Sequence, residues 1–266
     1  MDAAPTLSII SGTRDRKEEL ARLIKSVVEH TCDVDWELVI ADAGERYHPW
    51  HPHPRVKIVP ERPRLWPAAG YNRLVREHAR GEWVAWLNDD AEVTPRWALA
   101  MLSALSNRKD VGLGCFYFED EGTYGPGFRV NDWLGLVYAN FGCIRRELFL
   151  EVGGFDERCK FYAMDNSLTF RVMDRGLGVL AVPGARVVHH RHWSERRSAD
   201  QDEAESFRAA GVNALMADYE AKIGRFKSEQ ARFRPAAMVL PDSVCAQAAG
   251  AARGVAGGSE IVSGVA

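Results

Sequence analysis

Short apolar runs alternate with amphipathic segments along the first half of the chain. Runs typical of buried strands cover residues 7–10, 36–40, 56–59 and 83–87. Segments whose apolar residues recur at helical spacing lie between them, at residues 15–28 and 68–80. Asp15 and Glu18 match an approximate capping box at the start of the first of these helices. Alternation of this kind predicts a parallel, doubly wound α/β sheet.

The run at 83–87 ends in the polar sequence Asn88-Asp89-Asp90. Its five residues are all apolar, as in a strand covered on both faces. Acids at the carboxyl end of such a strand lie where open α/β sheets bind ligands, and carboxylate oxygens suit Mg²⁺ or Mn²⁺, which can bridge a diphosphate. The alternative is a solvated turn before a helix at 96–106 that Thr94 and Pro95 would cap.

The second half of the chain has a different pattern, which favours mixed strands and an acceptor pocket. A strand is expected at 111–118, a loop at 122–127, an apolar stretch at 134–143, helices at 145–151 and 165–175, and extended segments at 178–182 and 186–189.

Beyond these segments the chain becomes helical and then poor in large apolar residues. We predict a core domain over residues 1–193 and a C-terminal helical extension packed on it over residues 194–234. Residues 235–266, rich in Ala, Gly and Ser, are expected to form a disordered tail.

Composition excludes some classes of function. The 34 Lys and Arg against 37 Asp and Glu give a formal charge of −3, which does not indicate nucleic-acid binding. No apolar run approaches the roughly 20 residues of a membrane span, and the first residues lack a signal-peptide pattern, so a soluble cytoplasmic protein is expected. The five cysteines are odd in number and form no Cys-x-x-Cys pair, which predicts mostly buried thiols.

The most specific signature is the run Val152-Gly153-Gly154-Phe155-Asp156-Glu157, preceded by Arg145-Arg146-Glu147-Leu148-Phe149. Together with the strand ends described above, in the expected order, it resembles the inverting, family-2-type glycosyltransferases over residues 7–193. The resemblance implies the GT-A fold, a Rossmann-like and mostly parallel sheet flanked by helices. The glycine run itself predicts a tight turn that anchors Phe155 in the core.

The resemblance assigns the nucleotide-sugar site to strand ends. It implies that Thr13 and Asp42 line the nucleotide base, with Arg14 beside them. A carboxylate that accepts a hydrogen bond from a base imide favours a UDP- or dTDP-sugar donor. The alternative for Asp42 is a strand-end turn, which Asp-x-Gly sequences favour.

The family's segment before the metal motif is matched by 68–73, where Asn72 is expected to approach the sugar or diphosphate. Asn88 and Asp89 are assigned to nucleotide-sugar binding. Asp90 matches the acid that contacts the metal, with Asn88 in place of a first acid, and His189 is the second expected metal ligand. The implied cofactor is Mn²⁺ or Mg²⁺.

By the same resemblance, Asp165 is the catalytic base, and Met164 stands where a second acid is common. Asp165 would take the proton of an acceptor hydroxyl, on a glycan or glycoconjugate, as that hydroxyl attacks the anomeric carbon. Two alternatives stay open. Replacement of two acids by Asn88 and Met164 suggests a catalytically degenerate nucleotide-sugar binding protein, and Ser11-Gly12-Thr13-Arg14 partly matches a sugar-1-phosphate nucleotidyltransferase loop.

Overall fold

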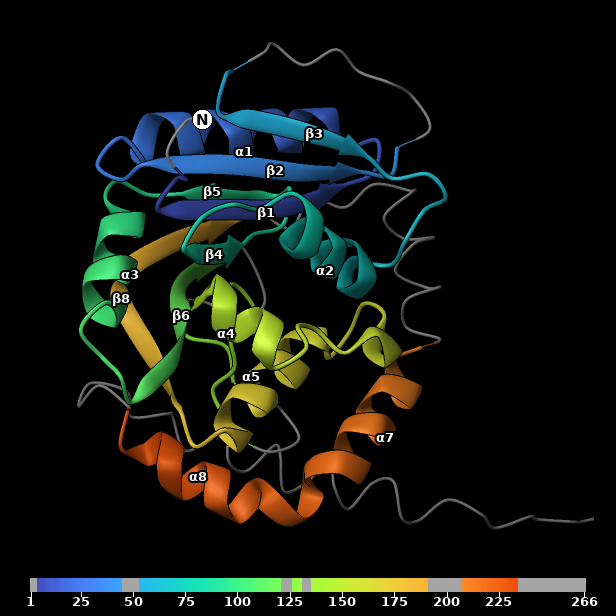
Figure 1. Ribbon diagram of the computed structural model, residues 1–266, viewed down its shortest axis with the longest axis vertical. Coiled ribbons are helices and arrows are strands. Elements are labelled where there is room, and N and C mark those ends of the chain that lie inside the picture. The colour runs from blue at the N-terminus through green and yellow to red at the C-terminus, as the bar shows by residue number, and fades with distance from the viewer. Residues whose placement is uncertain (1–3, 45–52, 121–125, 131–134, 191–206, 234–266) are drawn as a thin grey trace, which may run out of the picture.

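A computed structural model describes residues 4–44, 53–120, 126–130, 135–190 and 207–233 of the chain. Within these ranges, eight strands form a sheet in the order β3-β2-β1-β4-β7-β6-β8-β5 (Figure 1). The strands are β1 (Leu7–Thr13), β2 (Trp36–Asp42), β3 (Val56–Pro60), β4 (Trp83–Trp86), β5 (Ala91–Val93), β6 (Val111–Asp120), β7 (Gly142–Arg145) and β8 (Gly178–His189). The helices are α1 (Lys17–His30), α2 (Pro67–Glu77), α3 (Trp97–Leu105), α4 (Arg146–Glu151), α5 (Met164–Asp174), α7 (Arg208–Tyr219) and α8 (Ile223–Ala231), with 3₁₀ turns η1 (Glu157–Cys159) and η2 (Glu220–Lys222).

The first half of the sheet is parallel, as the sequence pattern predicts. β1 pairs in parallel with β2 and with β4, and β2 pairs with β3. Their carboxyl ends therefore meet at one edge. The second half is mixed, because β7 runs antiparallel to β4 and β6, and β5 runs antiparallel to β8.

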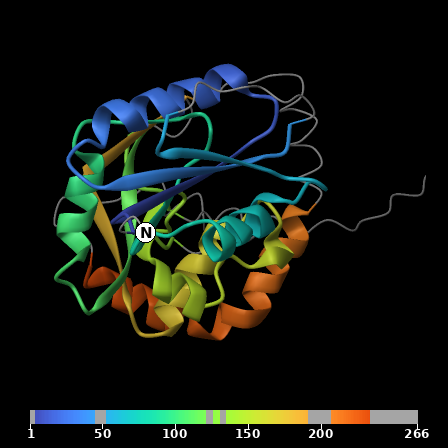
Figure 2. The same ribbon diagram turned by 45° about the horizontal axis from the view of Figure 1, so that its top comes forward.

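Both faces of the parallel strands are buried, and alternate residues enter two different core clusters. In β4, Val84 and Trp86 pack into one cluster, whereas Trp83 and Ala85 pack into the other. The second cluster also holds apolar residues of α1 and α3, and the first holds those of α2, α4, α5, α7 and α8. The blue helix α1 and the teal helix α2 accordingly lie on opposite sides of the sheet (Figure 2). Double coverage explains why the strands read as continuous apolar runs.

Two predicted helix starts are wrong. Asp15 has a φ of 54° and precedes the N-cap residue of α1, Arg16, which receives no side-chain capping bond. The helix α3 begins at Trp97 after Arg96, which is in the left-handed conformation, so Thr94 does not cap it. Instead, the Thr94 hydroxyl donates to the carbonyl of Arg186 on β8. At Thr94, a contact with β8 thus takes precedence over the local capping preference.

The C-terminal helices are part of the core. Leu215 of α7 and Phe226 of α8 are fully buried in the cluster that contains α2 and α5, and the Phe226 ring stacks on Phe170 of α5. Gln230 of α8 pairs with both backbone groups of Val137, donating to its carbonyl at 2.6 Å and accepting from its N–H at 2.8 Å. The predicted helical extension is confirmed, while the boundaries at 193 and 234 stay predictions.

Some sequence expectations lie outside the described residues. They concern most of the loop at 122–127, the last residues of the predicted core domain, the start of the helical extension, and the tail at 235–266. Among the helices of the described ranges, none has the length and apolar character needed to cross a membrane.

Phe226→Ala should lower the free energy of unfolding by about 3–5 kcal/mol, because it leaves a cavity in the core on which α8 packs. Phe161 is 41% exposed, so Phe161→Ala should change stability by no more than about 0.5 kcal/mol. Urea denaturation of the two variants measures both values. Equal losses would contradict the view that α8 belongs to the core.

Candidate active site

The carboxyl ends of β1, β2 and β4 bring most of the predicted nucleotide-sugar residues to one edge of the sheet. Thr13 ends β1 and is paired in register with Asp42, which ends β2. Leu87, just after β4, donates its N–H to the carbonyl of Ile10, and Asp89 and Asp90 follow directly. The parallel pairing thus places residues distant in sequence beside one another.

Asp89 and Asp90 are buried, with exposed fractions of 5% and 1%. The Thr13 hydroxyl donates to Asp89 Oδ2 at 2.8 Å. Arg16 donates from Nη1 to Asp89 Oδ1 at 2.6 Å, and its Nη2 lies 3.3 Å from Asp90 Oδ2. Arg16 was not among the predicted site residues. The acidic pair is therefore not a solvated turn but a buried pair compensated by a hydroxyl and a guanidinium.

Burial shifts the ionisation of this pair. It raises the pKa of Asp89 to about 7, with the neighbouring Asp90 charge adding to the rise and Arg16 opposing it. Burial also raises the pKa of Tyr71, whose hydroxyl donates to the carbonyl of Leu87 at 3.2 Å. Through this hydrogen bond Tyr71 contacts the segment that leads from β4 to the acid pair.

His189 joins the acid pair from the last strand. The antiparallel pairing of β5 and β8 sets Ala91 opposite His189, and His189 Nε2 lies 3.2 Å from Asp90 Oδ1. His190 points elsewhere, since its Nε2 lies 2.8 Å from Glu92 Oε2. His192, a weaker candidate, lies outside the described residues. The structure therefore brings together the two predicted metal ligands.

The donor atoms of Asp90 and His189 fit a hard divalent cation. Two ligands at about 2.1 Å in neighbouring octahedral positions lie about 3.0 Å apart, close to the observed separation of 3.2 Å. Within the described ranges no group of three or more His, Cys, Asp or Glu side chains forms a metal cage. A cation here would take its remaining ligands from substrate phosphates and water, which is how Mg²⁺ is usually bound in phosphate-transfer sites.

The other predicted donor-site residues make local contacts. Asp42 Oδ1 accepts the N–H of Gly44 at 2.9 Å, the bond expected of a strand-end turn. Asn88 accepts the N–H of Ala91 through its backbone carbonyl, and Arg14 is half-buried just after β1. The predicted contacts of these three residues with a nucleotide sugar stay predictions.

Asn72 has a clear structural task. Its Nδ2 donates to the carbonyl of Phe155, and its Oδ1 accepts the N–H of Phe155, both at 2.9 Å. The same Nδ2 lies 3.0 Å from Glu157 Oε1. The amide is thus occupied in holding the glycine turn, and a direct contact with the sugar or diphosphate stays a prediction.

The glycine turn behaves as its sequence predicts. Gly153 and Gly154 have φ values of 83° and 64°, and a Cβ on Gly154 would lie 2.3 Å from Asn72 Oδ1. The turn buries Phe155, whose ring packs edge-on against Trp86. This contact links the segment before α5, which carries the predicted base, to the end of β4, which precedes the acid pair.

Asp165 lies in the first turn of α5 and is 9% exposed. Asn140 donates from Nδ2 to Asp165 Oδ2, and the backbone N–H of Asn166 donates to Oδ1, both at 2.8 Å. Burial raises the pKa of Asp165 to about 6, and these hydrogen bonds limit the rise. Met164, in place of the expected second acid, packs into the core. Asn140 belongs to no motif recognised in the sequence, so its contact with Asp165 was not predicted.

The loop that carries Asn140 is fixed at several points. Ala139 donates its N–H to the Thr169 hydroxyl at 3.2 Å, and the Asn140 carbonyl accepts from Trp86 Nε1 at 3.0 Å. Val137 is held by Gln230 of α8. The amide that contacts Asp165 is therefore positioned by α5, β4 and the C-terminal helix together.

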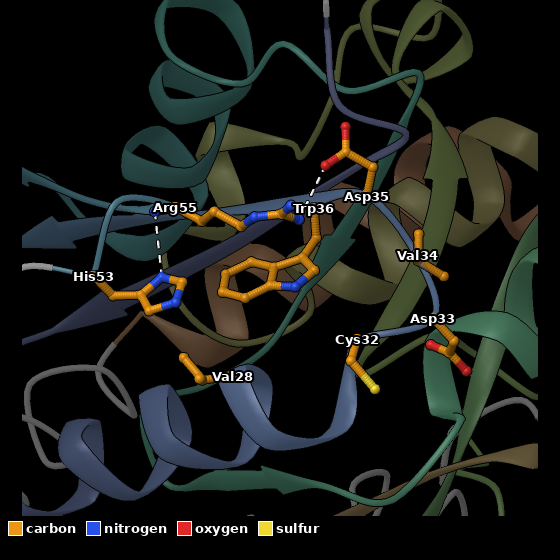
Figure 3. A pocket seen from close by; sticks show the side chains of 8 residues that line it. All are labelled: Val28, Cys32, Asp33, Val34, Asp35, Trp36, His53 and Arg55. Carbon is orange, nitrogen blue, oxygen red and sulfur yellow. Dashed lines mark hydrogen bonds and ion pairs between the residues drawn. The ribbon is translucent and has the colours of Figure 1, made fainter.

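A pocket of about 490 Å³ lies at the amino end of β2, away from the strand ends that carry the acids. Its walls include Trp36 and His53, whose rings are stacked 5.4 Å apart, and Arg55, which pairs with Asp35 at 3.0 Å (Figure 3). Cys32 lines it as well. None of the predicted site residues lies in this pocket.

Comparison with known proteins agrees with this geometry. The family described as glycosyl transferase family 2 matches residues 8–156, and the chain belongs to this family. A curated relative, the O-antigen biosynthesis protein RfbC of Myxococcus xanthus, is 28% identical over 73% of this chain, and the uncharacterized protein y4gI of Sinorhizobium fredii (strain NBRC 101917 / NGR234) is 27% identical over 78%. The chain spans 18% and 27% of the length of these two relatives.

Solved structures confirm the predicted fold. GalNAc-T7 with UDP, GalNAc and Mn²⁺ matches with a TM-score of 0.60 and 16% identity, covering 72% of this chain and 44% of that one. The mannosyltransferase PcManGT of Pyrobaculum calidifontis, in complex with GDP-Man and Mn²⁺, matches with a TM-score of 0.56 and 16% identity, covering 95% and 81%. The chain thus has the GT-A fold, with the mixed sheet described above.

Asn140→Ala should raise the pKa of Asp165 above its value of about 6, by roughly one unit, because it removes the donor that stabilises the carboxylate. Titration of the ¹³C carboxyl resonance of Asp165 measures the shift. Asn107 is exposed, so Asn107→Ala should leave the titration unchanged. An unchanged pKa in Asn140→Ala would show that this hydrogen bond does not control Asp165.

Proposed function

We propose that the protein transfers a sugar, with inversion, from a nucleotide-diphosphate sugar to an acceptor hydroxyl. The observation that carries the proposal is the pairing of Asp90 with His189 at the carboxyl edge of the sheet, within a family-2 domain. Two oxygen- and nitrogen-donor side chains 3.2 Å apart suit a cation that binds the donor diphosphate. Asp165, buried and hydrogen-bonded to Asn140, supplies the base.

In this reaction the acceptor oxygen forms a bond to the anomeric carbon while the bond from that carbon to the diphosphate oxygen breaks. The acceptor proton passes to Asp165, and the bonding pair leaves with the nucleoside diphosphate. Mn²⁺ or Mg²⁺, when bound, would neutralise the charge that develops on the diphosphate. Asp90 and His189 would hold it, while Thr13 and Arg16 hold Asp89 in place.

The pKa of Asp165 suits this role. A base with a pKa of about 6 is ionised at neutral pH yet binds a proton more readily than an ordinary aspartate. Asn140 and Asn166 orient both carboxylate oxygens. An acceptor hydroxyl therefore meets a carboxylate whose position is fixed before binding.

We further propose a UDP- or dTDP-sugar as donor, with Asp42 at the base. The solved relatives hold UDP in one case and GDP-Man in another, so the fold accepts more than one base. The acceptor we propose is a glycan or glycoconjugate, in line with the name of the Myxococcus xanthus relative.

A catalytically degenerate nucleotide-sugar binder is the second candidate, because Met164 is packed in the core where an acid is common. Turnover of a donor sugar excludes this second candidate.

A nucleotide panel tests the donor site. One of UDP, dTDP, GDP and CDP should raise the melting temperature in the presence of Mn²⁺, and EDTA should abolish the rise. Asp90→Asn should lose the Mn²⁺-dependent rise because it removes a ligand charge. Asp110 is exposed and paired with Arg108, so Asp110→Asn should retain it. Absence of any shift in the folded parent protein would count against the donor site.

Asp165→Asn should lower kcat by about 10²- to 10⁴-fold and leave nucleotide binding intact, because it removes the base but not the donor site. Asp174→Asn, at the other end of α5 and paired with Lys222, is the matched control and should keep full activity. In the parent, kcat/KM should fall as pH drops below about 6, where Asp165 becomes protonated. The assay measures nucleoside diphosphate release with the donor and acceptor selected from panels. Full activity of Asp165→Asn would refute its role as base.

A further inference from the structure

Arg16 contacts Asp90 as well as Asp89, and the proposed function gives its contact with Asp90 no role. It lies three residues after the end of β1 and is the N-cap residue of α1, and its side chain is 18% exposed. Its guanidinium spans the acid pair, with Nη1 at 2.6 Å from Asp89 Oδ1 and Nη2 at 3.3 Å from Asp90 Oδ2. Nη2 also lies 3.6 Å from Glu19 Oε1. The positively charged Arg16 guanidinium therefore already contacts Asp90, the carboxylate proposed to bind the cation.

Both oxygens of Asp90 are engaged in this arrangement. Oδ1 faces His189 Nε2 at 3.2 Å, and Oδ2 faces Arg16. A cation held between Asp90 and His189 would share one carboxylate with the guanidinium. Two positive groups a few ångströms apart in a buried site repel each other far more strongly than in water. Arg16 and a divalent cation therefore compete for Asp90.

The same guanidinium stabilises the protein without a metal. Asp89 and Asp90 are almost fully buried, and two adjacent buried carboxylates are costly unless they are compensated. Arg16 supplies a fixed positive charge to both. A nucleotide diphosphate makes it easier for a cation to bind beside Arg16, because the negative charge of the diphosphate offsets the extra positive charge of the cation.

We propose that Arg16 is a resident counter-ion of the Asp89–Asp90 pair. In this role Arg16 weakens the binding of a free divalent cation, so that binding of the cation depends on the nucleotide diphosphate. This inference rests on the proposed donor site at Asp90. In this view Arg16 positions the acid pair and controls when a cation can bind to it. Metal and nucleotide then bind cooperatively, since each removes the electrostatic penalty of the other.

The test is a titration of the purified full chain with Mn²⁺ alone, followed by the EPR signal of free Mn²⁺. Arg16→Met should bind Mn²⁺ at least about fivefold more tightly than the parent, because the competing charge is gone. Lys25 lies on the same helix with its side chain 73% exposed, so Lys25→Met removes the same charge at a distance and is the matched control. Tightening in Arg16→Met but not in Lys25→Met supports the inference. Equal affinities in these two variants, or weaker binding in Arg16→Met, would overturn it.

Cooperativity gives a second readout. With the nucleoside diphosphate that stabilises the parent protein, the gain in Mn²⁺ affinity caused by the nucleotide should be several-fold smaller in Arg16→Met than in the parent. An undiminished gain would contradict the dependence on nucleotide. Arg16→Gln, which keeps hydrogen-bonding groups but loses the charge, should behave as Arg16→Met does and decides the question if the Met variant does not fold.

Asp90→Asn separates this inference from the proposed function. Combined with Arg16→Met, it should abolish the tightened Mn²⁺ binding. If Asp90→Asn leaves Mn²⁺ binding unchanged in the parent background, the proposed metal site itself is wrong. If it removes binding while Arg16→Met has no effect, the metal site stands and the role of Arg16 is refuted.

Discussion

The structure around the candidate site depends on the burial of two carboxylates at the end of β4. Asp89 and Asp90 lie directly after a strand that is apolar on both faces, so water cannot compensate them. Compensation comes from two segments far apart in sequence: Thr13 and Arg16, at and just after the end of β1, and His189 at the end of β8. The acid pair therefore ties the first strand, the fourth and the last into one polar centre.

A second constraint connects this centre to the predicted base. Asn72 of α2 binds both backbone groups of Phe155, and two glycines with positive φ allow the chain to turn beneath it. The buried Phe155 ring then contacts Trp86 at the end of β4. Asp165 follows ten residues after Phe155, and the buried contacts of this segment set its position relative to Asp90 by packing.

Local sequence patterns predicted the elements and the strand-end residues well, for a physical reason. Strands such as 83–87 are buried on both faces, so their sequence alone carries the signal, and the parallel arrangement follows from the helices between them. Positive φ at Gly153 and Gly154 likewise leaves a clear sequence signature. The tail and the domain boundaries stay sequence predictions.

Contacts between distant segments were missed. Arg16 and Asn140 act through partners 73 and 25 residues away, which no local pattern reveals. The contact of the Asn72 amide with a backbone 83 residues further on was likewise not expected, while its contact with the donor stays a prediction. Capping by Thr94 failed for a similar reason, since its hydroxyl contacts a carbonyl 92 residues further on.

The C-terminal helices hold the loop that contacts the predicted base, Asp165. Gln230 satisfies both backbone groups of Val137, which are buried and would be costly to leave unpaired. That pairing fixes the start of the loop whose Asn140 contacts Asp165, while Thr169 and Trp86 fix its end. Gln230, 65 residues beyond Asp165, thus bears on the geometry of the predicted base. The candidate site therefore depends on the C-terminal helices as well as on the ends of the strands.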